Sequence, residues 1–152
     1  METSTVHVLV VDDNESFRRF VCSMLGQKPE SRVIGEAVDG LEAVQKAEEL
    51  RPDLILLDIG MPILNGIEAA RRICKLSPES KILFVSQESS ADVVEEAFRL
   101  GALGYIAKTD VGSELLTAVN AVLRGKTFAS SRLAERKFTG ALSSFLITET
   151  LS

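Results

Sequence analysis

The chain has 152 residues, 45% of them hydrophobic and 26% charged, which suffices for one domain with a hydrophobic core but not for two. Its net charge of -5 gives no basic field for nucleic acid, and no apolar run reaches the about 18 residues that a membrane span needs. With one histidine and two cysteines, neither a histidine-rich metal site nor a disulfide framework is expected, and a cytoplasmic location is expected.

Short apolar runs typical of β-strands alternate along the chain with stretches whose apolar residues recur at helical spacing. The first helix is predicted from about Asn14, a residue suited to capping it. Its apolar positions include Phe17, Phe20 and Val21. Strands are predicted at Val6–Asp13, from Arg32, and at Leu54–Leu57, Lys81–Ser86 and Gly104–Lys108; helices are predicted from about Asn14, from Gly40, around Ile67–Cys74, and at Ala91–Leu100 and Ser113–Leu123.

Five strand–helix units in this order predict an α/β fold. Parallel strands need crossover connections, and strands covered on both faces are apolar throughout, so the expected architecture is a doubly wound, five-stranded parallel sheet. We expect a single domain over residues 5–125. Residues 126–152 form a short C-terminal extension, for which a helix and a partly disordered tail are both left open, since its apolar residues are interspersed with serine and threonine.

Polar residues stand at the ends of four of these strands. The first strand ends in Asp12 and Asp13, the third is followed by Asp58, the fourth ends in Ser86 and the fifth in Lys108. Ligands of open parallel sheets bind beyond these carboxyl ends, so the five side chains are expected to converge. Three carboxylates at close range require either a protonated acid or a cation, and Mg²⁺ is the cation that best combines carboxylates with phosphate oxygens.

The same group of residues therefore predicts a phosphoryl-transfer site. Asp58 is the expected nucleophile, Lys108 would neutralise charge on the transferred group, and Ser86 would donate a hydrogen bond to it. Each residue alone has a simpler explanation: the acids could cap helices, Ser86 could be a loop hydroxyl, and Lys108 could be a solvated surface amine. Only their common placement at the strand ends makes the set specific.

Four segments resemble the CheY-like receiver domains of two-component response regulators. "VLVVDDNESFRRF" resembles the acidic pair of that family, "DLILLDIGMPILNG" its phosphoacceptor loop, "ILFVS" its switch strand and "GALGYIAK" its lysine motif. The resemblance runs from about Val6 to Arg124 and is strongest to the NarL/FixJ subfamily, whose receivers usually precede a LuxR-type helix-turn-helix. It implies the flavodoxin-like strand order 2-1-3-4-5.

The resemblance also implies roles for the site residues. Asp58 would accept a phosphoryl group from a sensor histidine kinase or phosphotransfer protein. Asp13, Asp58 and the backbone carbonyl of Gly60 would hold Mg²⁺, and Asp12 would act on the metal through water. Lys108 would contact the phosphoryl group.

A conformational switch is implied as well. Ser86 would bind the phosphoryl group and move together with Tyr105, changing the surface formed by residues 91–123. Tyr105 alone would more simply be a packed side chain of a short strand. Gln87 stands where many receivers have a smaller residue, which predicts restricted access of water to the phosphoryl group.

Several functional alternatives remain at this point. The chain is expected to be a signalling switch rather than an enzyme with a separate substrate, either as a single-domain regulator or as the receiver of a LuxR-type transcription regulator. A phosphorylation-independent scaffold is the second reading. A haloacid dehalogenase-like phosphatase would need an Asp-x-Asp pattern after a strand, which is lacking, and a flavodoxin-like cofactor binder is disfavoured by the acids of the first loop. Homodimerisation on phosphorylation is left open.

Overall fold

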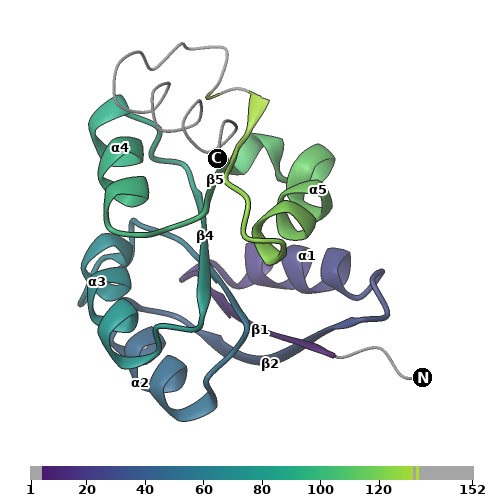
Figure 1. Ribbon diagram of the computed structural model, residues 1–152, viewed down its shortest axis with the longest axis horizontal. Helices are drawn as coiled ribbons and strands as arrows, with labels where there is room; N and C mark the ends of the chain where they lie inside the picture. Colours follow the sequence, from purple (N-terminus) through teal and green to yellow (C-terminus); the bar gives the residue numbers. More distant parts are fainter. Residues whose placement is uncertain (1–4, 132, 134–152) are drawn as a thin grey trace.

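The computed structural model describes residues 5–131 and 133, and the fold is shown in Figure 1. Strands and helices alternate in the predicted order up to the fifth helix. The strands are β1 (Val6–Val11), β2 (Ser31–Ala37), β3 (Leu54–Leu57), β4 (Lys81–Ser86), β5 (Gly104–Ala107) and β6 (Phe128–Ala129). The helices are α1 (Glu15–Leu25), α2 (Gly40–Leu50), α3 (Gly66–Leu76), α4 (Ala91–Arg99) and α5 (Val111–Leu123), and a 3-10 turn, η1 (Lys108–Asp110), precedes α5.

The strands form one parallel sheet in the order β2-β1-β3-β4-β5-β6. The α/β class, the parallel sheet and the order 2-1-3-4-5 of its first five strands are confirmed, but the predicted number of five strands is wrong. The sixth strand pairs with β5, matching Gly104 with Phe128 and Tyr105 with Ala129. A strand of two residues shows no alternation of polar and apolar side chains, so the sequence pattern could not reveal it.

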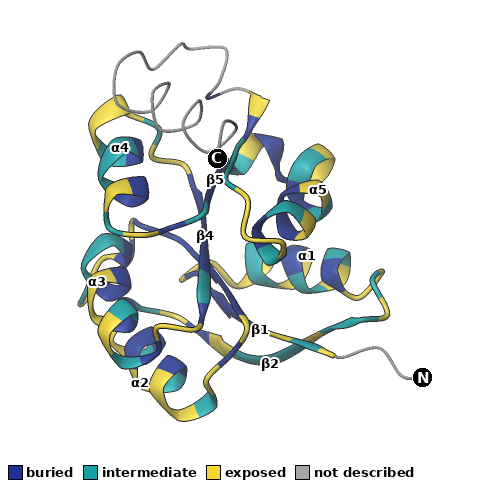
Figure 2. Cartoon of the chain, in the orientation of Figure 1, coloured by how far each residue is buried: buried dark blue, intermediate teal, exposed yellow. Residues whose placement is uncertain are grey.

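Helices cover both faces of the sheet, with α2, α3 and α4 on one side and α1 and α5 on the other (Figure 1). The residues of β3 show how the core divides. Ile55 and Leu57 belong to the cluster on the α2–α4 side, whereas Leu54 and Leu56 belong to the cluster on the α1 and α5 side. Side chains alternate along a strand, so burial on both faces gives the uninterrupted apolar run of this strand. Figure 2 shows buried residues in dark blue in the central strands and in parts of the helices.

The helices α1 to α4 each follow a polar residue whose side chain accepts a hydrogen bond from the first turn. The predicted cap Asn14 is confirmed, because its side-chain oxygen accepts from the backbone N–H of Phe17 at 2.8 Å. Other boundaries and faces differ from the prediction. The helix α5 begins two residues before Ser113, and Phe20 and Leu41, which fit the apolar spacing, are 46% and 41% exposed.

The described residues end beside β5. Ser130 is fully buried, and Leu133 is fully buried within the cluster on the α2–α4 side. Most of the predicted extension, residues 126–152, lies outside the described residues, and its boundary stays a prediction. Both cysteines are free, and no helix within residues 5–131 is long and apolar enough to cross a bilayer.

Candidate functional site at the ends of the strands

Two of the predicted carboxylates lie side by side because their strands are neighbours. The strands β1 and β3 pair in register up to Val11 and Leu57, and the next backbone N–H, that of Asp58, donates to the Val11 carbonyl at 3.0 Å. Asp12 and Asp58 are therefore held at the same edge, 2% and 5% exposed. Asp13 is exposed, and carboxylate oxygens of the three acids lie within 4.8 Å of one another.

Lys108 supplies the positive charge predicted for this edge. Its ammonium nitrogen lies 2.8 Å from Asp12 Oδ2 and 3.4 Å from Asp58 Oδ2, and 4.5 Å from the centre of the Phe17 ring. The lysine follows β5 directly, so the strand end fixes its backbone while the long side chain crosses to the acids. The amine neutralises part of the charge that two buried carboxylates create.

Burial and mutual repulsion govern the protonation of these groups. Burial raises the pKa of the Asp58 carboxyl, the charge of Asp12 raises it further, and Lys108 and the Ile59 N–H oppose the rise only in part. Burial also lowers the pKa of the Lys108 amine, but its interactions with Asp12 and Asp58 outweigh burial, so that its pKa lies above the ordinary value. The lysine is therefore charged at neutral pH, while burial and the neighbouring acid disfavour the charged form of Asp58.

The donor set fits a hard divalent cation. Asp12 Oδ2 is buried, and apart from the Lys108 ammonium at 2.8 Å it has no partner among the described residues, which leaves lone-pair capacity on that oxygen. The exposed Asp13 lines, with Ile59 and Gly60, an open pocket of ≈ 540 Å³. Three carboxylates on a side that is open to solvent match the preference of Mg²⁺ for few protein oxygens and several waters.

The predicted switch residues lie next to the acidic cluster. Ser86, 1% exposed at the end of β4, accepts a hydrogen bond from the Glu88 N–H at 3.1 Å, and its hydroxyl also helps to lower the Asp58 pKa. The Tyr105 hydroxyl donates to the carbonyl of the same residue, Glu88. The tyrosine is fully buried, and burial raises the pKa of its hydroxyl. Both switch residues thus hold the loop between β4 and α4.

Two further residues shape the site: Gly66, which belongs to the phosphoacceptor-loop segment identified from the sequence, and Arg18, which was not predicted. A Cβ added to Gly66 would lie 1.9 Å from the Asp58 carbonyl oxygen, so only glycine lets α3 begin this close to the strand end. Arg18 donates from Nη1 to the Asp12 carbonyl at 2.8 Å and from Nε to Glu36 at 2.9 Å. The Asn65-Gly66 pair was a visible signal for the first, but nothing in the sequence pattern marked Arg18.

The comparisons with known proteins agree with this geometry. The model of the response regulator receiver domain family matches residues 8–120. The chain belongs to this family. Receiver domains are regulatory switches, and the predicted identity is confirmed.

The transcriptional regulatory protein LiaR of Bacillus subtilis is 37% identical over 129 residues, which cover 85% of this chain and 61% of LiaR. A protein-glutamate methylesterase/protein-glutamine glutaminase of Thermotoga maritima is 44% identical over 110 residues, 71% of this chain and 32% of that protein. The chain thus spans about a third to three fifths of the length of these relatives. The activities in their names belong to those longer proteins.

Solved structures give the same assignment. A LuxR-family response regulator from Aurantimonas sp. SI85-9A1 has a TM-score of 0.83 at 28% identity, over 95% of this chain and 99% of that one. The receiver domain of the putative response regulator NarL from Mycobacterium tuberculosis has a TM-score of 0.77 at 30% identity, over 82% of this chain and 100% of that one. The predicted similarity to LuxR-type receivers is confirmed.

Proposed function

We propose that this receiver domain accepts a phosphoryl group on Asp58 and uses the added charge to change its α4–β5–α5 surface. The observation that carries the proposal is the position of the Asp58 carboxylate: it is 5% exposed, beside two other acids, with the Lys108 ammonium 3.4 Å from its Oδ2. The donor would be a histidine kinase or phosphotransfer protein, as in two-component systems.

The remaining residues have separate roles in this proposal. Asp13, Asp58 and the Gly60 carbonyl would hold Mg²⁺, and Asp12 would act on it through water. When bound, the metal would neutralise charge on the transferred group. Lys108 can contact a phosphoryl oxygen because its amine already lies between Asp12 and Asp58.

The switch residues would transmit the new charge. A dianionic group on Asp58 offers the Ser86 hydroxyl a stronger acceptor than it has without phosphorylation. Movement of Ser86 toward it pulls on the Glu88 N–H, and Tyr105 is bonded to the Glu88 carbonyl. The loop before α4 is therefore the element through which the site would act on the α4–β5–α5 surface.

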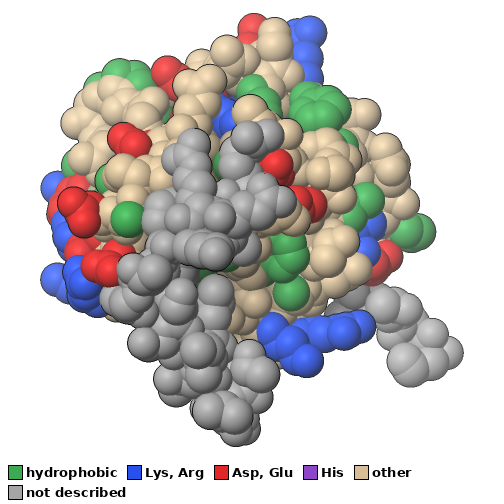
Figure 3. Space-filling model, turned by 90° about the horizontal axis from the view of Figure 1, so that it is seen from above, with side chains coloured by type: hydrophobic (Ala, Val, Ile, Leu, Met, Phe, Trp, Pro, Cys, Tyr) green, Lys and Arg blue, Asp and Glu red, His purple; other side chains and the backbone are tan. Residues whose placement is uncertain are grey.

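The partners and the whole-protein output are also part of the proposal. The proposal does not assign the chain to a LuxR-type transcription regulator in particular, because methylesterases are among its relatives as well. On the face seen in Figure 3, the basic side chains of the described residues stand in separate groups and form no continuous patch, which gives no support to direct contact with nucleic acid. Phosphorylation-driven dimerisation, a cytoplasmic location and the lack of a separate substrate stay predictions.

Phosphorylation of the full chain with acetyl phosphate and Mg²⁺ tests the proposal. Intact-mass spectrometry should detect one added phosphoryl group, and treatment with a chelator should prevent the addition. Asp58→Asn should abolish it, because an amide cannot form the acyl phosphate. The matched control is Asp92→Asn, an exposed acid in the first turn of α4, which should be phosphorylated normally. An unmodified wild-type mass, or equal modification of Asp58→Asn, would contradict the proposal and favour a scaffold.

A further inference from the structure

The short segment after α5 is hydrogen-bonded along the edge of β5 that lies opposite β4. We call Phe128–Ser131 together with Leu133 the β6 segment. The Phe128 N–H donates to the Leu103 carbonyl at 2.9 Å, and the Ser130 N–H donates to the Tyr105 carbonyl at 3.1 Å. These two bonds hold the segment against the backbone of Leu103 and of Tyr105.

Ser130 continues the pairing with its side chain. Its hydroxyl oxygen accepts from the Ala107 N–H at 3.1 Å, and Ser130 is fully buried. Ala107 is the last residue of β5 and directly precedes Lys108. The hydroxyl thus satisfies the buried amide next to the lysine whose amine reaches the acidic cluster, which couples the position of that strand end to the β6 segment.

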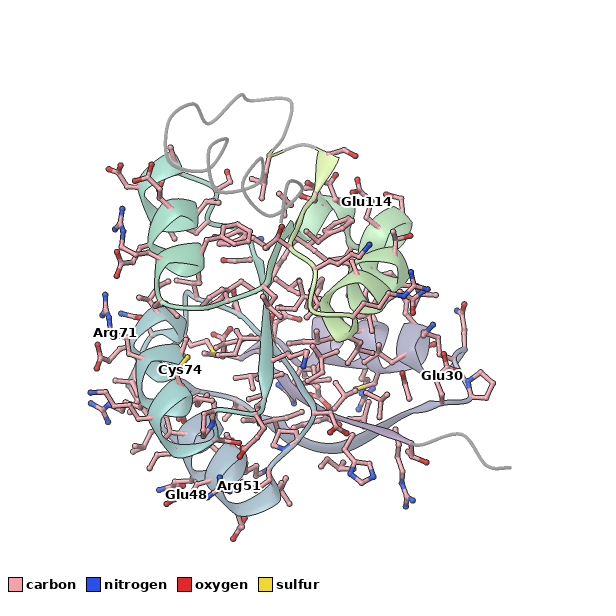
Figure 4. All side chains as sticks on the ribbon, in the orientation of Figure 1. Glu30, Glu48, Arg51, Arg71, Cys74 and Glu114 are labelled. Atoms are coloured by element: carbon pink, nitrogen blue, oxygen red, sulfur yellow. The ribbon has the colours of Figure 1, made fainter. Side chains whose placement is uncertain are left out.

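Two more contacts fix the segment to the helices on either side. The Ser131 N–H donates to both carboxylate oxygens of Glu114 in the first turn of α5, at 3.1 and 3.2 Å; Figure 4 labels Glu114 beside β6. Leu133 lies at 0% exposure in the buried cluster that also contains Tyr105 and, from α4, Phe98. The β6 segment therefore contacts α5, pairs with β5 and packs in the same hydrophobic cluster as α4.

The same tyrosine is bonded to the loop that would move. Its hydroxyl donates to the Glu88 carbonyl, and the Glu88 N–H donates to Ser86. In this buried position Tyr105 makes both contacts: its hydroxyl bonds the loop at Glu88, and its ring lies in the hydrophobic cluster that contains Leu133. Removal of Leu133 would open the cluster around the ring and make this position of Tyr105 less favourable.

From these contacts we propose that the β6 segment is a built-in ligand of the switch. A phosphoryl group on Asp58 would draw Ser86 and the loop of Glu88 inward, and the buried Tyr105 is the arrangement that anchors this loop through the Glu88 carbonyl. Docking of the segment on β5 and occupancy of Asp58 therefore stabilise the same buried arrangement of Tyr105. The inference rests on the proposed function of Asp58. Two events that favour one conformation favour each other to the same extent. Docking of the segment should thus tighten binding of a phosphoryl mimic, and the mimic should tighten docking.

The amino-acid composition provides a direct probe. The chain contains one tyrosine, Tyr105, and no tryptophan, so its intrinsic fluorescence reports on this ring alone. Beryllofluoride with Mg²⁺ serves as the phosphoryl mimic. Half-saturation is read from fluorescence, ring exposure from quenching by iodide, and docking from hydrogen exchange of the Ala107 and Ser130 amides.

We expect Leu133→Ala to raise the beryllofluoride concentration at half-saturation by about tenfold and to increase iodide quenching, because docking is weakened. Ser130→Ala should raise the midpoint by about threefold, since only one acceptor is lost. Ser131→Ala is the matched control: its contact with Glu114 uses the backbone N–H, so it should behave as wild type. In wild type, beryllofluoride should slow exchange at both amides.

The outcomes separate the coupling from the proposed function. A wild-type protein without any response to beryllofluoride would refute the function of Asp58 and the coupling with it. A responsive wild type together with unchanged midpoints and quenching in both variants would refute the coupling alone. Tighter binding in the variants would also refute it, because docking would then oppose phosphorylation. Should Leu133→Ala fail to fold by circular dichroism, Ser130→Ala decides.

Discussion

The acidic site and the β5–β6 edge lie at neighbouring strand ends but are built from different kinds of contact. Asp12, Asp58 and Lys108 meet through charged side chains that are buried or nearly so. The β5–β6 edge is held mainly by main-chain hydrogen bonds, one hydroxyl and one leucine. The chemistry of the acidic site thus depends on a few side chains that no other residue can replace. The contact of β6 with Tyr105 depends mainly on backbone hydrogen bonds, which many sequences could form.

Alanine substitution of two glycines measures this difference in packing and should give the largest effect. At Gly66 the new Cβ would meet the Asp58 carbonyl oxygen at 1.9 Å, and backbone cannot yield; at Gly104 in β5 it would meet Leu83 Cδ1 at 2.5 Å, a side-chain end that can rotate. We expect Gly66→Ala to lower the free energy of unfolding by about 3 kcal/mol and Gly104→Ala by about 1 kcal/mol. Urea denaturation measures both, and equal losses would contradict the contrast.

A double-mutant cycle tests whether charge dominates the acidic site. In the presence of a chelator, Lys108→Met leaves Asp12 and Asp58 without their counter-ion, and should cost about 2 kcal/mol of stability. In the Asp58→Asn background the same change should cost about 1 kcal/mol less, because one of the two buried charges is gone. At the other edge, Glu114→Gln keeps an acceptor oxygen for Ser131 and should change stability by less than about 0.5 kcal/mol. Additivity of the cycle would exclude charge coupling.

The raised pKa of Asp58 predicts a smaller, pH-dependent effect. An acid whose pKa is higher in the folded than in the unfolded protein binds more protons when folded, so stability is highest below its ordinary pKa of 3.8 and falls as pH rises through the folded value. Thermal melts in chelator should show this loss above about pH 4. Asp58→Asn should remove that part of the slope, and Asp92→Asn should keep it.

The sequence predicted the acidic site more fully than the β5–β6 edge. Asp12, Asp13, Asp58, Ser86 and Lys108 follow from strand ends, because an apolar run stops at each one and parallel strands bring those ends together. The β6 segment gave no such signal, since Phe128–Ala129 is too short for periodicity and most of the segment's bonds use backbone groups that every residue carries. For Phe20 the sequence pattern predicted burial wrongly, because the residue fits the helical spacing of apolar positions but lies half exposed.

The smallest expected effect concerns the opening between the two regions. Gln87 is exposed and lines a pocket with Phe17, Ser86, Lys108 and Thr109. A phosphoryl group held by Ser86 and Lys108 would border this pocket, so we expect water to reach the group from there. Gln87→Ala should shorten the lifetime of phosphorylated protein about two- to threefold, an amount typical of one displaced polar contact. Loss of phosphoryl groups after removal of acetyl phosphate measures it; Gln27→Ala, an exposed change at the end of α1, is the control. An unchanged lifetime would show that Gln87 does not limit water.

The shortness of β6 also bears on how the protein behaves at high concentration. All four residues of β5 are buried, so without β6 the sheet would end in an apolar strand with unpaired amides and carbonyls. Open edges of this kind recruit strands from other molecules, and a very short terminal strand is one way in which proteins prevent such growth. Two residues, Phe128 and Ala129, pair with this edge but offer little length for a further strand. The segment that contacts the switch tyrosine therefore also covers this edge of the sheet, and we expect its removal to promote aggregation.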